Sequence, residues 1–264
     1  KGLPYLDGFT AIFVPKESTR VDAMRGDRAA LDFRGMPPSA IDQLKQALGH
    51  RIAVQTSDWN LADEITINHA RKPFNDLRVR RALALAIDQW HTGPALSKVT
   101  SIHTVGGLVF PGSPLAATRE ELEKIVGFWP DIEKSRAEAR RLLHEAGAEG
   151  LSFELLARNV DQPYKYLDNW AIDDWAKLGV KVTQKVVPTG RWYDALRGGT
   201  FDVVAEPNCQ SVVHPLLDIQ QFLPSDVSSQ NYNQYKDPVQ VATDGRLLDD
   251  TYPLQPRDPD GAFA

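Results

Sequence analysis

The most regular alternation of apolar and polar positions in the chain lies between Lys72 and Asp88. Its apolar side chains fall on one face at helical spacing, whereas the arginines lie largely off that stripe. Pro73 pushes the residue before it out of the α region, and either Asn75 or Asp76 can cap the first free backbone N–H groups. The pattern therefore predicts an extended segment and then an amphipathic helix whose apolar stripe is Val79, Ala82, Leu83, Ala86 and Ile87.

Strand-like and helical patterns alternate on both sides of this segment. Before it we expect strands over 9–14, 29–33 and 51–56, helices over 19–25 (capped by Ser18) and 38–48, and an extended stretch over 64–68. After it we expect strands over 151–157, 180–187 and 201–205, and helices over 164–178, 192–197 and 216–222. This order predicts an α/β protein with right-handed crossovers and largely parallel sheets.

Two further features concern the organisation of the chain. Residues 93–130 are rich in glycine and proline and are expected to be mostly loop, before a helix with a possible capping box between Ser135 and Glu138 that ends at Gly147. Residues 23–33 and 195–205 share the order helix, glycine, then a strand with one aspartate. Such turns recur in many α/β proteins, but the matching element order favours two lobes of similar architecture.

The run at residues 73–88 also carries a resemblance. It reads Pro-Phe-Asn-Asp-Leu-Arg-Val-Arg-Arg-Ala-Leu-Ala-Leu-Ala-Ile-Asp, which is similar to the sequence that opens the second lobe of the family 5 (oligopeptide, dipeptide and nickel type) solute-binding proteins of ABC importers. The resemblance implies a two-lobed, periplasmic-binding-protein-like α/β fold of type II, cluster C. Residues 1–68 would then form part of the first lobe and 69–264 the second, with the interlobe crossover near 64–70.

The likeness extends from Leu3 to about Pro238 and implies a central portion of a protein commonly about twice as long. The resemblance implies that the missing parts complete the first lobe and supply a signal peptide or lipid anchor. The first eight residues themselves contain no signal-peptide hydrophobic region. The resemblance implies a periplasmic receptor that captures a small solute and delivers it to the permease subunits of an ABC transporter.

Composition excludes some functions. The 264 residues are 42% apolar and 25% charged, which is ordinary for one large or two modest globular domains. A net charge of −5 without a basic block argues against a nucleic-acid partner. No apolar run approaches the ~20 residues that cross a bilayer, so no membrane span is expected in this segment. The single cysteine, Cys209, excludes an intrachain disulfide and leaves the redox compartment open.

Ligands of open α/β sheets lie beyond the carboxyl ends of the strands. Arg34 follows the expected strand 29–33, and the segment 206–215 follows the strand 201–205, so the two loops should face each other across the interlobe cleft. In the family the second loop carries an acid for the α-ammonium of a peptide, but no carboxylate lies between Asn208 and Pro215. A free peptide is therefore in doubt, although Glu206 could swing in. The polar contacts expected from this loop are Asn208, Cys209, Gln210 and His214.

Two more candidates lie outside these loops. Arg158 follows the strand 151–157 where dipeptide-binding relatives hold an arginine for the ligand's carboxylate, which a guanidinium grips with two hydrogen bonds; an ordinary surface arginine is the alternative. Trp59, just before the crossover, could supply an apolar wall, or could be a packing residue. Three other tryptophans, in or beside expected helices, are interpreted as packing residues: Trp170, Trp175 and Trp192.

Catalysis is the other class of function considered. Cys209 and His214 lie five residues apart and could form a thiol–imidazole pair, so the alternative hypothesis is a two-domain α/β enzyme with Cys209 as its nucleophile. No flanking motif marks such a nucleophile. The histidines show no paired metal-ligand spacing and the glycine pairs match no phosphate-binding fingerprint, so neither metal nor cofactor is expected. A sensor module fused to a regulator is a third possibility.

Overall fold

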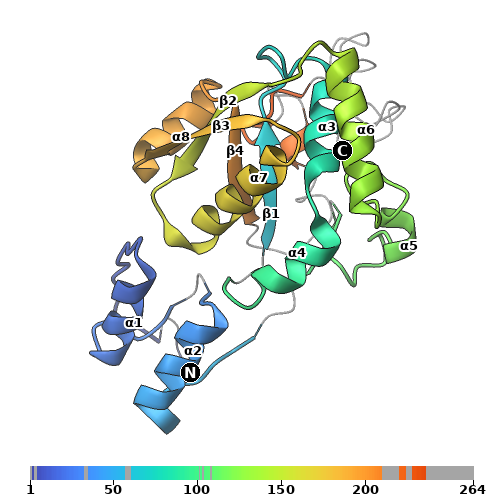
Figure 1. Cartoon of the computed structure of the whole chain (residues 1–264). Coiled ribbons are helices and arrows are strands. Elements are labelled where there is room, and N and C mark those ends of the chain that lie inside the picture. Colours follow the sequence, from blue (N-terminus) through green and yellow to red (C-terminus); the bar gives the residue numbers. More distant parts are fainter. Residues whose placement is uncertain are drawn as a thin grey trace.

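A four-stranded sheet forms the centre of the computed structural model, which describes residues 2, 5–32, 35–56, 61–100, 102, 104–107, 109–209, 220–223 and 228–235. The strands are ordered β1-β4-β2-β3 across the sheet (Figure 1). Their bounds are Leu61–Ile67 (β1), Ser152–Arg158 (β2), Lys181–Val187 (β3) and Val203–Cys209 (β4).

Three of the four strands are parallel. β2 pairs in parallel with β3 along its length and with β4 at Leu155↔Val203 and Leu156↔Val204, whereas β1 runs antiparallel to β4. Helix α7 (Tyr166–Ala176) connects β2 to β3, and α8 (Thr189–Gly198) connects β3 to β4. The expected α/β class with a largely parallel sheet is confirmed. The carboxyl ends of β2 and β4 point toward the part of the molecule that holds the first two helices (Figure 1).

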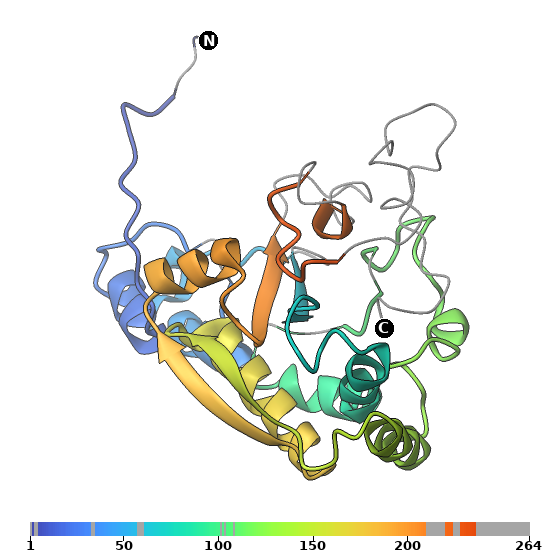
Figure 2. The same ribbon diagram turned by 90° about the horizontal axis from the view of Figure 1, so that it is seen from above.

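Helices cover both faces of the sheet because successive strand residues point to opposite sides. On one face α3 (Leu77–Ala86), α6 (Ile132–Glu145) and α7 enclose the main core, which includes Phe74, Leu83, Leu155, Trp175 and Val203 (Figure 2). On the other face α8 encloses a second core, formed by Leu156, Val160, Tyr164, Trp192, Leu196, Phe201 and Val204.

Helix α3 occupies the signature segment. Asp76 is its N-cap and accepts a hydrogen bond from the backbone N–H of Arg78 at 2.8 Å, as one of the two expected caps. The whole predicted stripe is buried, but so is Arg80, which donates to the carbonyl of Phe74 at 2.7 Å. The residues before the helix form a hydrogen-bonded turn, in which the N–H of Asn75 donates to the carbonyl of Arg71, so the expected extended segment is wrong there.

The expected loop region and the following helix differ in part from the prediction. Two short helices, α4 (Gln89–Leu96) and α5 (Arg119–Leu122), lie within or overlap residues 93–130. Helix α6 begins at the N-cap Asp131, so the predicted capping box is wrong. Ser135 is instead buried, and its hydroxyl donates to the carbonyl of Leu85 at 2.8 Å. The side chain that the local sequence predicted as a helix cap therefore forms a hydrogen bond between the packed helices α6 and α3.

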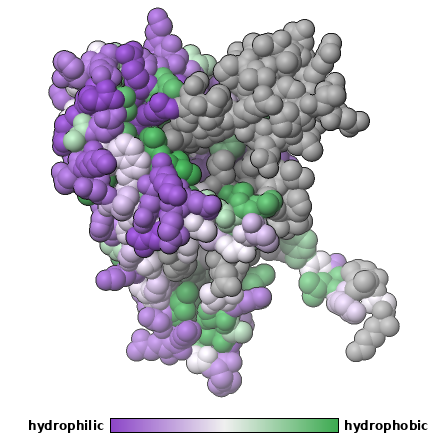
Figure 3. Space-filling view, turned by 90° about the vertical axis from the view of Figure 1, so that its right-hand side faces the viewer, coloured by the Kyte–Doolittle hydropathy of each residue, from purple (hydrophilic) through white to green (hydrophobic). Residues whose placement is uncertain are grey.

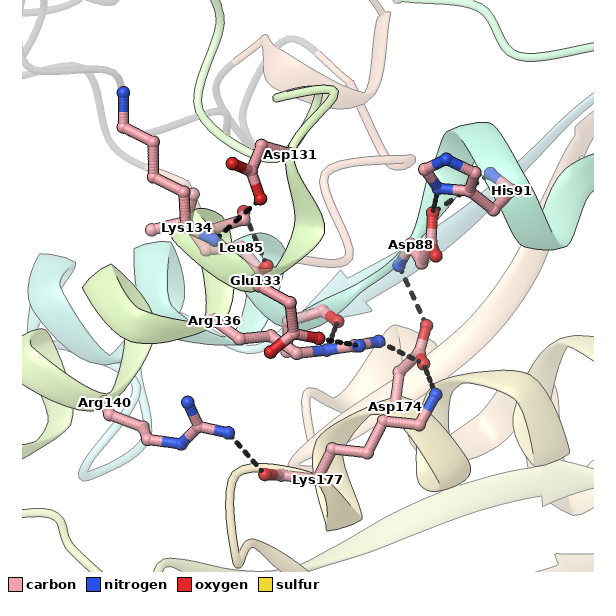
Figure 4. Close-up of polar contacts among 12 residues, drawn as sticks. Leu85, Asp88, His91, Asp131, Glu133, Lys134, Arg136, Arg140, Asp174 and Lys177 are labelled. Carbon is pink, nitrogen blue, oxygen red and sulfur yellow. Dashed lines mark hydrogen bonds and ion pairs between the residues drawn. The ribbon is translucent and has the colours of Figure 1, made fainter.

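A buried ion pair connects the helices of the main-core face. The guanidinium of Arg136 on α6 donates to Asp174 on α7 at 2.8 Å, and Lys177 donates to the same carboxylate at 2.6 Å (Figure 4). The backbone N–H of Asp88, the N-cap of α4, donates to the other oxygen of Asp174 at 2.9 Å. Asp174 is therefore fully enclosed by donors from three elements.

The amino-terminal region contains helices rather than the expected strands. Helix α1 (Glu17–Arg25), helix α2 (Pro38–Leu48) and the short turn η1 (Gly49–Arg51) surround a small core of Val21, Ala40 and Leu44. Within the described residues, the segments 9–14, 29–33 and 51–56 form no strand, so these three predictions are wrong. Of the two segments that share the order helix, glycine and strand, residues 195–205 therefore form it, as α8 and β4, whereas the described part of residues 23–33 contains no strand.

The physical reason is the lack of a pairing partner. A strand's backbone hydrogen bonds come from a neighbouring strand, and none of the strands in the described part of the chain pairs with these segments. Large apolar side chains are consequently exposed, as at Phe9, Ile12 and Leu31. The described residues 5–10 project away from the body of the molecule (Figures 2 and 3).

The later predictions are largely confirmed. β2, β3, α2, α7 and α8 lie within two or three residues of their expected bounds, and α8 ends at Gly199 with a positive φ of 60°. β4 is longer than expected and continues to Cys209. Of the helix expected over 216–222, the described residues show the 3₁₀ turn η3 (Gln220–Phe222), and the remainder lies outside the described residues.

Candidate functional site

Arg158 is the last residue of β2, at the edge of the sheet where ligands of α/β proteins bind. Its side chain points to the same face as Leu156 and is buried, with 5% of its surface exposed. The Nε atom donates to the hydroxyl of Thr189 at 3.1 Å and Nη1 donates to the hydroxyl of Tyr164. Among the described residues no carboxylate lies within ion-pair distance of this guanidinium. It is a buried cation held by neutral groups.

Aromatic rings surround the guanidinium. Its central carbon lies 4.8 Å from the ring of Tyr164, 5.2 Å from Tyr193, 5.4 Å from Trp192 and 6.0 Å from Phe13. The indole N–H of Trp192 is also buried and has no hydrogen-bond partner among the described residues. Ring faces attract a cation but do not replace a counter-ion, and a buried unpaired charge costs several kcal/mol, of the order of 3–5. The arrangement suits an anionic group of a ligand.

Glu206 lies on the neighbouring strand β4. Extending the β2–β4 register by two residues places it level with Arg158, and its side chain points to the same face of the sheet as Val204. The hydroxyl of Thr66 on β1 donates to Oε1 of Glu206 at 2.6 Å. Burial raises the pKa of the Glu206 carboxyl to about 7. The group therefore changes charge near neutral pH.

The crossing strand β1 carries two more acids. Glu64 lies directly opposite Glu206 in the β1–β4 ladder, and its carboxylate accepts a hydrogen bond from Gln221 at 2.7 Å. Asp63 points to the other face, where burial raises its pKa to about 7 and where Oδ1 finds no hydrogen-bond partner in the described part of the chain. At its end β1 is fixed by Asn68, whose side-chain amide donates to the carbonyls of Gly199 and Phe201 at 2.9 and 3.0 Å.

The amino-terminal region meets the sheet beside Arg158. The helical turn η2 (Asp161–Lys165) follows β2, and its Asp161 accepts hydrogen bonds from the backbone N–H of Glu17 at 3.2 Å and from Lys16 at 3.4 Å. Gln162 donates to the carboxylate of Glu17 at 3.0 Å. α1 thus has its first N–H capped by a residue from the sheet side, and the predicted cap Ser18 lies inside the helix.

The remaining candidates are placed only in part. Asn208 and Cys209 belong to β4, where they pair with Ala62 and Leu61, so the prediction that they lie in a loop is wrong. The antiparallel partner β1 extends β4 beyond the point where its own apolar pattern ends. The side chains of these two residues lie outside what the structure describes, as do four other candidates: Arg34, Trp59, Gln210 and His214.

Sequence reasoning missed most of the groups around Arg158. Trp175 is a packing residue as predicted, because it is 1% exposed and its indole N–H donates to the carbonyl of Leu83 at 3.0 Å. Trp192 packs in the second core but also lines the Arg158 site. The alternation of side chains along a strand could have indicated Glu206. Residues 156 and 158 point to one face of the sheet from β2, and residues 204 and 206 point to the same face from the neighbouring strand β4.

Neither a metal site nor a membrane helix emerges from the described residues. Within those ranges, no group of three or more His, Cys, Asp or Glu side chains could hold a metal ion. In the same part of the chain, no helix combines the length and apolar character needed to cross a bilayer.

The fold is that of the periplasmic binding proteins. The described elements resemble a structure of Haemophilus influenzae OppA in complex with the peptide RPPGFSPFR, with a TM-score of 0.69 and 21% sequence identity. The match covers 93% of this chain and 46% of the other. At this identity the likeness shows the fold alone.

The sequence identifies the family. A family model for bacterial extracellular solute-binding proteins, family 5 (middle), matches residues 1–230, and the chain belongs to this family. It is 29% identical over 250 residues to the periplasmic oligopeptide-binding protein OppA of Salmonella typhimurium, covering 92% of this chain and 44% of that protein. It is 30% identical over 172 residues to di/tripeptide-binding protein 1 of Pseudomonas aeruginosa. This match covers 63% of this chain and 30% of that protein.

Both relatives are named as binding proteins rather than as enzymes, and the family resemblance seen in residues 73–88 is confirmed. The chain spans less than half the length of these curated relatives.

Proposed function

We propose that this protein is a non-catalytic, periplasmic solute receptor that captures a small carboxylated or peptide-like compound and delivers it to the permease subunits of an ABC importer. The buried guanidinium of Arg158 carries this proposal, because it has hydrogen-bonding neighbours but no counter-ion among the described residues. The names of the relatives support the same class of ligand.

In the proposed mechanism the solute's carboxylate binds Arg158 and receives a further hydrogen bond from the indole N–H of Trp192. A fork of guanidinium donors matches a carboxylate, and the aromatic surroundings exclude water, which strengthens the pairing. Phe13 already lies over the guanidinium from the amino-terminal side. We propose that residues 1–68 belong to one lobe and 69–264 to the other, with the crossover near 64–70, and that the solute favours the closed arrangement.

Other contacts are proposed from the strand ends. Asn208, Cys209, Gln210 and His214 would supply polar contacts beyond β4, and Trp59 and Arg34 would form walls. Alkylation of Cys209 with iodoacetamide is then expected to reduce solute affinity at most. A chemical turnover that is abolished by this reagent would contradict the non-catalytic role.

Isothermal titration calorimetry tests the proposal. The titrants are small carboxylates and short peptides, each paired with its carboxamide, and the variants are Arg158→Gln and the matched control Arg140→Gln. Arg140 is exposed, and within the described residues its guanidinium donates to the carbonyl of Lys177 alone. We expect carboxylates to bind at least about tenfold more tightly than carboxamides, and Arg158→Gln alone to abolish this preference.

A thermal melt of each variant confirms that it is folded. Equal affinity of wild type and Arg158→Gln for every carboxylate would overturn the proposed site. Tight binding of peptides whose carboxylate has been amidated would show that Arg158 does not recognise the ligand.

A further inference from the structure

A cavity of about 250 Å³ lies between helix α4 and helix α7 (Figure 1). The residues that α7 contributes to its lining recur at helical spacing and share one face of the helix; they include Tyr166, Trp170, Asp173 and Lys177. Trp170 packs against the main core, on the opposite face of the sheet from the side chain of Arg158. The cavity is therefore separate from the proposed solute site.

The space remains open because α4 does not fill it. None of the residues of α4 is buried, and the helix contains Pro94, which lacks a backbone N–H. The side chains that α4 contributes to the lining are Thr92 and Leu96, one turn apart. Because a cavity of ~150 Å³ holds benzene, this one suits a compact ligand of about ten non-hydrogen atoms.

The lining combines aromatic rings with an unpaired carboxylate. Tyr166 and Trp170 are neighbours on α7 because they lie four residues apart. Asp173 is exposed and forms no hydrogen bond or ion pair within the described residues. Lys177 lies one turn further along the helix, but its ammonium group donates to Asp174 at 2.6 Å (Figure 4). The charge of Asp173 is therefore not compensated by a neighbour in that part of the chain.

Further negative charge reaches the cavity at Tyr166. Burial raises the pKa of the Tyr166 hydroxyl, and the carboxylates of Glu17 and Asp161 raise it further. Asp161 has Lys16 at 3.4 Å, whereas Glu17 accepts a hydrogen bond from the uncharged amide of Gln162. Acids of the amino-terminal region and of η2 thus add to the effect of the unpaired carboxylate on α7, and together they favour a cation in the cavity.

We propose that this cavity is a second ligand site, which binds an organic ammonium ion with a compact aromatic or other apolar body. The body packs against Tyr166, Trp170 and Leu96, which provide apolar surface. The ammonium group pairs with the Asp173 carboxylate and with the aromatic ring faces, which attract cations. The inference is independent of the proposed function, because neither Arg158 nor the strand ends contribute to the lining.

Titration with three probes of similar size and different charge tests the inference. At neutral pH 2-phenylethylamine is protonated, 2-phenylethanol is uncharged and 3-phenylpropionate is an anion. Binding is followed in proton–nitrogen correlation spectra of the whole chain, through the assigned indole resonances of Trp170 and Trp192. The indole N–H of Trp170 is buried without a hydrogen-bond partner among the described residues, so it should respond to an occupant of the cavity. Trp192 reports on the Arg158 site.

We expect the amine to shift the Trp170 resonance with a Kd of about 1 mM, a value that suits a ligand of this size. It should bind about tenfold more tightly than the alcohol, and the anion should bind most weakly. A shift of the Trp192 resonance without one at Trp170 would place the amine in the Arg158 site; the inference would then be overturned and the proposed function would stand. Equal affinities for amine and alcohol, or no response to the amine, would overturn it without any substitution.

Three variants locate the site. Asp173→Asn removes the charge and keeps the shape, and its matched control is Asp194→Asn, an exposed aspartate of α8 on the other face of the sheet. Asp173→Asn should weaken binding of the amine about fivefold and leave that of the alcohol unchanged, whereas the control should behave as wild type. Thr92→Phe fills the cavity from α4 and should abolish the response of Trp170 to both probes. Unchanged amine affinity in Asp173→Asn or in Thr92→Phe would overturn the inference.

Discussion

Replacing Asp174 by asparagine should destabilise the protein strongly, because this residue is the buried end of the ion pair in Figure 4. Only 1% of its side chain is exposed, and that of Arg136 is 8% exposed. Asparagine keeps the volume and one acceptor oxygen for the backbone N–H of Asp88, but it removes the buried counter-ion of Arg136. The guanidinium then keeps, among the described residues, the 78% exposed Glu133 at 3.5 Å, which compensates a buried charge poorly.

The expected magnitude follows from that geometry. Removing one partner of a buried pair costs roughly 3–5 kcal/mol, mostly the penalty of the remaining unpaired charge. The retained hydrogen bond to Asp88 favours the lower end, about 3 kcal/mol. Lys177 contacts the same carboxylate, but half of its side chain is exposed. Lys177→Met should therefore cost less than about 1 kcal/mol and serves as the control.

Urea denaturation followed by circular dichroism measures both effects. With a slope of about 3 kcal/mol per molar urea, Asp174→Asn should lower the midpoint by about 1 M and Lys177→Met by less than about 0.3 M. The double variant Arg136→Met/Asp174→Asn should be less destabilised than the sum of the two single variants, because each removes the same pair. A midpoint for Asp174→Asn within 0.3 M of wild type would refute the assigned role of the pair.

Two other properties are expected from the structure. Asp161→Ala removes the carboxylate that caps the first N–H of α1, so it should lower the local stability of α1 by about 1 kcal/mol. Amide hydrogen exchange should become faster in α1 and stay unchanged in the sheet. Exchange in α1 that equals that of the exposed control variant Asp173→Ala would contradict this. Burial raises the pKa of Asp168 from 3.8 to about 7, so the folded state holds the proton of this carboxyl more strongly than the unfolded state does. The protonated carboxyl therefore contributes fully to the free energy of unfolding below about pH 4, and this contribution is lost as the pH rises through 7. Asp168→Asn should match wild type in melting temperature at about pH 4 and exceed it increasingly up to pH 8. Equal loss of stability with pH in both proteins would exclude Asp168 as a source.

The candidate site shows where local sequence reasoning stops. The position of Arg158 followed from the end of a well-marked strand, because the apolar residues of β2 run up to Ala157. The residues around Arg158 could not be predicted in this way. Tyr164, Trp192 and Tyr193 come from two other elements, η2 and α8, and Phe13 comes from the amino-terminal region. Glu206 was visible only as an acid next to a strand, and its burial against Thr66 depends on β1 pairing with β4.

The sequence by itself determined helices with a clear apolar stripe, such as α3 and α2, and the strands β2 and β3 of the carboxyl-terminal part. These depend on interactions between residues close in the chain and on a periodicity that identifies the buried face. Only the tertiary structure decided that residues 9–14 remain unpaired, that Ser135 bonds to α3 instead of capping a helix, and that β4 extends to Cys209. Each of these depends on hydrogen-bond partners supplied by distant segments, and local sequence does not specify them.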